Sequence, residues 1–71
     1  MSWTYISRQY LGSCLAHMGL RSDALQAFQK SMELGNDDSV VLMNYASTLS
    51  DVGQFHRAEP YFRRALERQD N

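Results

Sequence analysis

Few side chains in this sequence could do chemistry. Its two histidines, His17 and His56, lie far apart, and neither has a cysteine or a carboxylate cluster beside it at metal-ligand spacing. The single cysteine, Cys14, has no neighbour in the sequence that would activate its thiol, so we expect it to pack as a small hydrophobic residue. The sequence contains no Gly-rich phosphate loop and no signature of a nucleophile with its base. These residues predict neither an enzyme nor a metal or cofactor site, and any catalysis would belong to a separate domain that this chain regulates.

The charged residues do not indicate a nucleic-acid or membrane partner either. Seven basic and eight acidic side chains are intermixed and leave a net charge of −1. The arginines near the C-terminus alternate with acids, and a Glu59–Arg63 pair is typical of a solvated helix face. No apolar run approaches the ~20 residues that span a bilayer, and the first residues lack the basic and apolar regions of a signal peptide. We therefore expect a cytoplasmic protein whose partners are neither nucleic acids nor membranes.

The sequence matches itself when it is shifted by 34 residues. The identical pairs are Ser13 and Ser47, Leu15 and Leu49, Gly19 and Gly53, Ala24 and Ala58, Phe28 and Phe62, and Glu33 and Glu67. Most of these matches fall on small and apolar residues, which packing constrains, rather than on polar surface positions. The shift therefore indicates an internal repeat of two units.

Each unit has the pattern of two helices. The i, i+3, i+4, i+7 spacing of one buried helical face occurs at Leu42, Tyr45, Ala46 and Leu49. Gly19 and Gly53 follow the first helix of each unit, where a left-handed backbone conformation costs glycine least. We predict helices near residues 3–18, 22–34, 38–52 and 56–69. We expect Ser22 to cap the second helix, and Asp37 or Asp38 to cap the third.

Small residues recur where neighbouring helices would have to approach closely. Gly12 and Ala46 take such positions in the first helix of each unit, and Phe28 and Phe62 are expected to fill the space beside them. This alternation of small and large residues predicts two interlocking hairpins.

Pro60 interrupts the pattern of the last predicted helix, where an interior proline can cost ~3 kcal/mol. We place it within about the first turn, where most backbone N–H groups have no partner inside the helix. We therefore expect Pro60 to sharpen the helix start without breaking the helix.

With these residues in register, the sequence resembles the tetratricopeptide repeat family, whose unit is a helix–turn–helix of 34 residues. The marks of the first unit are Leu11-Gly12, Leu15, Gly19, Ala24, Phe28 and Ser31. Those of the second are Tyr45-Ala46, Leu49, Gly53, Phe55, Ala58, Phe62 and Ala65. The resemblance implies an all-α fold of two tandem helix–turn–helix hairpins, which is a fragment of an α-solenoid with four antiparallel helices. It further implies one domain over residues 1–71, with repeats at about 5–38 and 39–71. The sequence departs from the family in lacking the proline that commonly ends a unit, since Asn36 and Asp70 stand there.

In this family the first helix of each repeat lines a concave groove, which implies an adaptor or scaffold that binds a peptide or a partner helix. The matching positions are Ile6, Gln9, Ser13, Ala16 and His17 in the first repeat and Val40, Met43, Asn44, Ser47, Ser50 and Asp51 in the second. Asn44 is the favoured contact because its amide can both donate to and accept from a peptide backbone. The alternative is that the repeat prefers asparagine there for its own packing. Gln9 and Ser13 replace a lysine and an asparagine with which some members clamp a C-terminal carboxylate, so we expect a different ligand.

Two repeats are fewer than a stacked array normally needs. Stacked hairpins bury their faces against one another, and about three units with polar caps are usual. The uncovered ends are expected to expose two sets of residues, Trp3, Tyr5 and Tyr10 at one end and Tyr61, Ala65 and Leu66 at the other. Either the chain is part of a longer array, or a second copy covers these ends in a homo-oligomer.

Overall fold

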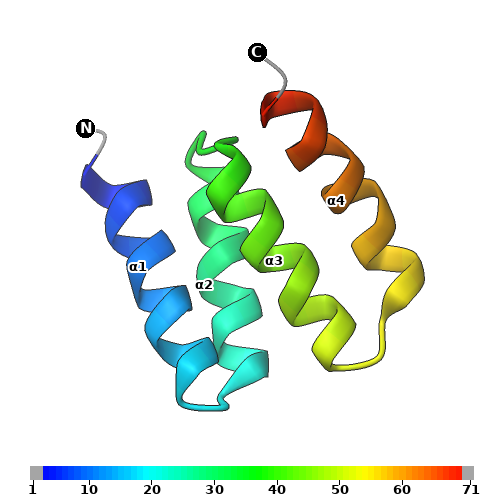
Figure 1. The fold of residues 1–71 in the computed structure, drawn as a ribbon. Helices are drawn as coiled ribbons and strands as arrows, with labels where there is room; N and C mark the ends of the chain where they lie inside the picture. The colour runs from blue at the N-terminus through cyan, green and yellow to red at the C-terminus, as the bar shows by residue number, and fades with distance from the viewer. Residues whose placement is uncertain (1–2, 70–71) are drawn as a thin grey trace.

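The computed structural model describes residues 3–69, apart from the side chains of Trp3 and Tyr5. Four helices follow one another, α1 (Trp3–His17), α2 (Arg21–Glu33), α3 (Ser39–Asp51) and α4 (Phe55–Gln69), and the described residues contain no strand. Each helix runs antiparallel to the one before it, so that α1 and α2 form one hairpin, α3 and α4 form a second, and α2 packs against α3 between them (Figure 1). The all-α prediction of two hairpins is confirmed, and every predicted helix boundary lies within one residue of the observed one.

The helices end where glycine permits a sharp turn. Gly19 and Gly53 have φ angles of 82° and 83°, in the left-handed region that the sequence predicted for them. After α1, the N–H groups of Gly19 and Leu20 donate to the carbonyls of Ala16 and Leu15 at 3.0 and 2.9 Å. This paired arrangement satisfies carbonyls that the end of a helix leaves without partners, and it recurs after α2 and α3.

The helix starts follow the predictions only in part. Asp38 is the N-cap of α3, as expected, because its side chain accepts a hydrogen bond from the backbone N–H of Val40 at 3.4 Å. The prediction for Ser22 is wrong. The chain enters α2 directly from the turn, so the N-cap is Leu20, whose side chain makes no capping bond, and Ser22 already lies inside the helix.

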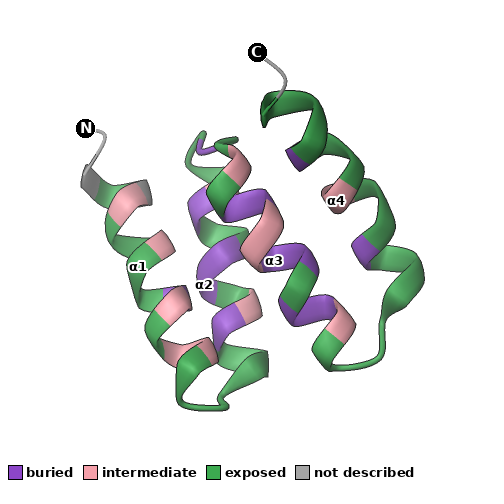
Figure 2. Ribbon diagram, viewed as in Figure 1, coloured by how far each residue is buried: buried purple, intermediate pink, exposed green. Residues whose placement is uncertain are grey.

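The core lies between the two hairpins and is built mainly from α2 and α3 (Figure 2). Its fully buried residues include Phe28 of α2 and Leu42 of α3, together with Ala46 at one of the predicted positions of close approach. Tyr45 packs edge-on against Tyr61 at a centroid distance of 4.7 Å, and burial raises the pKa of its hydroxyl. The closest approach is at Gly12, where an added Cβ would lie 2.7 Å from the ring of Phe28. The interlocking of small and large residues is therefore confirmed at Gly12.

Helix α4 continues through Pro60 without a break. Pro60 was expected within about the first turn of this helix, and that prediction is wrong by about half a turn. Helix α4 begins at Phe55, so Pro60 is its sixth residue. The proline ring removes the N–H that would have donated to the carbonyl of His56. Packing of α4 against α3 through Ala58 and Ala65 compensates for this loss, since both alanines belong to the buried core.

The two ends of the stack differ from the expectation. Ala65 was expected to be exposed, but it is fully buried, because its short side chain lies in the core that α4 shares with α3. Tyr61 is half-buried against Tyr45, whereas Leu66 is 56% exposed. At the other end Tyr10 is exposed, and the side chains of Trp3 and Tyr5 lie outside the described part of the structure.

Candidate interaction groove

A depression of about 240 Å³ is lined mainly by residues of α1 and α3. These two helices run in the same direction (Figure 1). The lining residues of the depression are Ser13, Ala16, His17, Phe28, Asn44, Ser47, Thr48 and Asp51. Six of these eight are residues that the sequence assigned to the groove. The remaining two, Phe28 and Thr48, were not assigned to it. Thr48 follows Asn44 by one helical turn, and this spacing is the signal that could have identified it.

Polar groups of α1 and α3 meet in this depression. Asn44 Nδ2 donates to Ser13 Oγ at 3.5 Å, which is long for a hydrogen bond and leaves the amide readily available to a competing partner. Within the described part of the chain no donor reaches Asn44 Oδ1. The backbone carbonyl of Asn44 accepts from Thr48 Oγ1 at 2.8 Å, so this hydroxyl is already used within α3. The depression therefore offers an amide with both a donor and an acceptor, beside the hydroxyls of Ser13 and Ser47.

One ion pair lies at the rim. Arg21 Nε is 3.7 Å from Asp51 Oδ2, and the two side chains are 48% and 59% exposed. Exposed pairs of this kind contribute little to stability because solvent screens them. His17 is exposed near Asp51, on the last turn of α1.

The other predicted groove residues do not line this depression. Ile6, Gln9 and Met43 are half-buried, and Met43 packs against the core, whereas Val40 is 49% exposed at the start of α3. Gln9 has a further role inside the structure, because its Oε1 accepts from Asn36 Nδ2 at 2.7 Å. Gln9 is therefore less available to a ligand than the family pattern implied.

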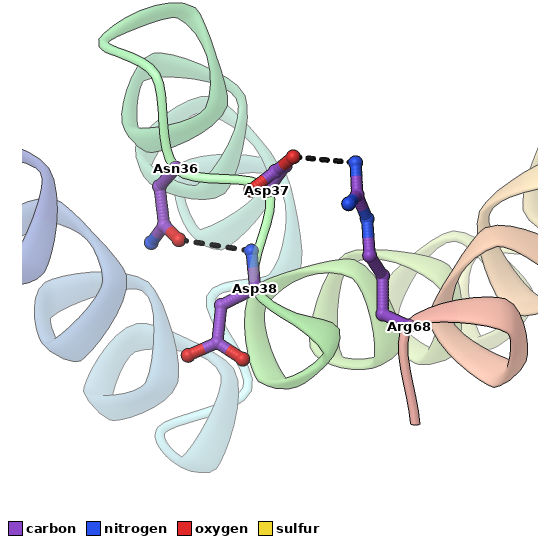
Figure 3. A network of polar contacts seen from close by, with 4 residues as sticks. All are labelled: Asn36, Asp37, Asp38 and Arg68. Atoms are coloured by element: carbon purple, nitrogen blue, oxygen red, sulfur yellow. Dashed lines mark hydrogen bonds and ion pairs between the residues drawn. The ribbon is translucent and has the colours of Figure 1, made fainter. Parts of the chain in front are cut away.

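The connection between α2 and α3 holds a polar network that sequence reasoning missed. Asn36 is only 5% exposed. Its Nδ2 also donates to Ser31 Oγ at 2.9 Å. Its Oδ1 accepts from the backbone N–H of Asp38 at 3.2 Å, as Figure 3 shows. The next residue, Asp37, accepts from Arg68 Nη2 at 2.5 Å, which ties the end of α4 to the same loop (Figure 3). No local sequence signal identifies the whole network, because two of its contacts, Asn36–Gln9 and Asp37–Arg68, join residues 27 and 31 positions apart.

The remaining chemical candidates can be placed within residues 3–69. No group of three or more His, Cys, Asp or Glu side chains in this range could hold a metal ion. Cys14 is a free and exposed thiol, so the prediction that it packs in the interior is wrong. The Glu59–Arg63 pair is confirmed at 3.1 Å. None of the helices in this range is long and apolar enough to cross a membrane.

Comparison with known proteins finds a family similarity over the second hairpin. Residues 40–71 match a family model described as Tetratricopeptide repeat, and this range includes nearly all of α3 and α4. No curated protein matches the chain significantly, and neither does any solved structure. The four helices of the structure are consistent with tetratricopeptide repeats, and the first hairpin corresponds to the second through the 34-residue shift.

Proposed function

We propose that this chain binds a peptide or partner helix along α1 and α3, because residues 40–71 match the tetratricopeptide repeat, a noncatalytic repeat that generally mediates protein–protein interaction. The observation that carries the proposal is that Ser13, His17, Asn44, Ser47 and Asp51 line one depression. In this proposal the chain is a cytoplasmic adaptor or scaffold domain over residues 1–71, with repeats at about 5–38 and 39–71, and it needs no cofactor.

The chemistry of the groove suits an extended peptide. Asn44 offers both an amide donor and an amide acceptor, as a peptide backbone requires. Val40 is apolar and 49% exposed on the first turn of the same helix, so an apolar ligand side chain could cover it. The ligand would run from Val40 at one end of α3 towards Asp51 at the other.

A selection from a random-peptide library tests this proposal. We expect the unmodified chain to enrich a peptide family whose binding falls at least about tenfold in the double variant Asn44→Ala, Ser47→Arg, because truncating a buried contact and filling the depression cost about 1.4 kcal/mol or more. The matched control is Gln26→Arg on α2, which adds the same charge at an exposed position away from the depression. Equal binding by the double variant and the control would show that the ligand site lies elsewhere.

A second candidate function is self-association through α4 with a second copy of the chain. The repeat itself favours it, because Phe62 and Leu66 correspond by the 34-residue shift to Phe28 and Met32, which lie in the core or pack against it. Phe28 is fully buried, whereas Leu66 is 56% exposed. At the opposite end, the exposed and polar Ser7 and Arg8 correspond to the buried Val41 and Leu42, so at these two positions α1 does not repeat the apolar face of α3. A two-fold contact between two α4 helices therefore fits better than a head-to-tail stack.

Sedimentation equilibrium measured against concentration tests the second candidate. We expect a monomer–dimer equilibrium that Leu66→Glu shifts at least about tenfold towards the monomer, since a buried leucine contributes about 1.5–3 kcal/mol. Gln69→Glu, one turn further along α4, is the control for added charge. A chain that remains monomeric at millimolar concentration would eliminate this candidate and leave the groove proposal unaffected.

A further inference from the structure

The basic side chains of this protein are distributed unevenly over its helices. Six of the seven lie on the second helix of each hairpin, namely Arg21, Lys30, Arg57, Arg63, Arg64 and Arg68. The seventh, Arg8, is on α1, but it lines a separate depression with Leu11, Leu15 and Lys30 on the outer face of the first hairpin. Helix α3 contains no lysine or arginine. None of the residues that line the groove depression is therefore a lysine or an arginine.

The depression has one acidic side chain, and it lies at one end of the groove. Asp51 is the only acidic residue that lines the depression, and it is the last residue of α3. Helix α1 ends at His17, beside the same depression. The C-terminal end of a helix carries a partial negative charge, and here two such ends lie next to a carboxylate. Acceptor oxygens of Ser13, Ser47 and Asn44 complete the lining.

Arg21, the ion-pair partner of Asp51 within the chain, leaves the Asp51 carboxylate able to accept further hydrogen bonds. Arg21 Nε approaches Asp51 Oδ2 to 3.7 Å, which is beyond hydrogen-bond distance, and both side chains are about half exposed. A ligand cation that is partly shielded from water in the depression would interact with the carboxylate more strongly than this exposed pair does. Arg21 would then compete with the ligand for Asp51.

We propose that the ligand of this groove is a peptide that places a lysine or arginine side chain against Asp51, between the ends of α1 and α3. This inference rests on the proposed function of the groove and adds the chemistry of the partner. The basic side chain lies beside Asp51 and the hydroxyls of Ser13 and Ser47, while the peptide backbone meets the amide of Asn44.

Three short peptides test the charge of the ligand directly. We would titrate Ac-Ala-Lys-Ala-NH2, the same peptide with norleucine, and the same peptide with glutamate into the 15N-labelled chain and follow backbone amide shifts. The norleucine side chain has nearly the shape of lysine without the charge. We expect the lysine peptide to shift the amides of Ser13, Ser47 and Asp51 with a Kd about fivefold lower than that of the norleucine peptide, and the glutamate peptide to bind most weakly.

Single substitutions in the groove separate Asp51 from the overall charge of the protein. Asp51→Asn should raise the Kd of the lysine peptide to that of the norleucine peptide. Asp23→Asn, which removes the same charge from the outer face of α2, should leave it unchanged. Arg21→Ala removes the competitor and should lower the Kd of the lysine peptide about twofold to threefold.

The outcomes distinguish this inference from the function on which it rests. If the lysine and norleucine peptides bind the groove equally well, or if Asp51→Asn and Asp23→Asn have the same effect, the inference is wrong while the groove remains a peptide site. If none of the three peptides shifts any groove amide at 10-fold excess over millimolar protein, the inference is wrong, and the random-peptide selection decides separately whether the groove binds longer peptides.

Discussion

Replacing Gly12 with leucine is expected to lower the free energy of unfolding by about 2–4 kcal/mol, most of the stability that a single core of this size normally provides. A Cβ at this position would lie 2.7 Å from Cδ1 and Cε1 of Phe28 and 3.0 Å from its Cζ. The ring cannot move aside, because Phe28 is fully buried at the centre of the core. Leucine gains about 1 kcal/mol of helix propensity over glycine, which offsets only part of the cost of forcing α1 and α2 apart.

Thermal unfolding followed by circular dichroism measures this effect. A loss of this size should lower the melting temperature by more than about 10 °C in a domain of this length. Cys14→Leu is the matched control, because it places leucine two residues further along α1 at an exposed position, and it should change stability by less than about 0.5 kcal/mol. A second test is the pair Gly12→Ala and Phe28→Leu, whose combined loss should be smaller than the sum of the single losses. If Gly12→Leu is as stable as Cys14→Leu, then α1 does not pack against Phe28 as described.

Replacing Asn36 with alanine is expected to cost about 2–3 kcal/mol, because it removes three hydrogen bonds at a site that is only 5% exposed. Both hydrogens of Nδ2 are used, one on Gln9 and one on Ser31, and Oδ1 holds the backbone of Asp38 at the start of α3. The side chain therefore links α1, α2 and α3. Its backbone N–H also donates to the carbonyl of Ser31 at 3.1 Å, a bond that proline, the usual residue of the family at this position, would lack.

Urea denaturation of four variants tests the role of this network. Asn36→Asp keeps the shape and the acceptor but removes the donor and places a charge beside Gln9 Oε1, so it should destabilise the protein at neutral pH at least as much as Asn36→Ala. Gln9→Ala should cost less, because Gln9 is only half-buried. Gln29→Ala, an exposed amide on α2, should be within about 0.5 kcal/mol of the unmodified chain. Equal stability of Asn36→Ala and Gln29→Ala would mean that the network does not hold the hairpins together.

The core positions were largely predictable because they repeat. The 34-residue shift places Gly12, Phe28 and Ala46 at positions where packing leaves little choice, and all three are buried. Ala65 shows the limit of this reasoning. The uncovered end of the stack was expected to expose Ala65 together with Tyr61 and Leu66, but a side chain as short as alanine is covered by the neighbouring helix of its own hairpin.

The candidate groove was predictable only in part. The family pattern selected residues by their positions on α1 and α3. The selected residues that line one depression are Ser13, Ala16, His17, Asn44, Ser47 and Asp51. The family pattern could not reveal that Gln9 is hydrogen-bonded to Asn36, because these residues are 27 apart in the chain and neither belongs to a pattern that involves the other. The Arg68–Asp37 contact could not be predicted from the sequence for the same reason, because these residues are 31 positions apart.

The sequence by itself determined the four helices, the glycine turns between paired helices and the arrangement of two hairpins. These features depend on interactions between residues a few positions apart, and on a periodic burial that the repeat displays twice. Only the tertiary structure decided which groove side chains stay available, which loop residue links the hairpins, and that lysine and arginine are absent from the lining of the depression. Those outcomes depend on which groups meet across distant segments, where a polar group must find a partner once it is buried.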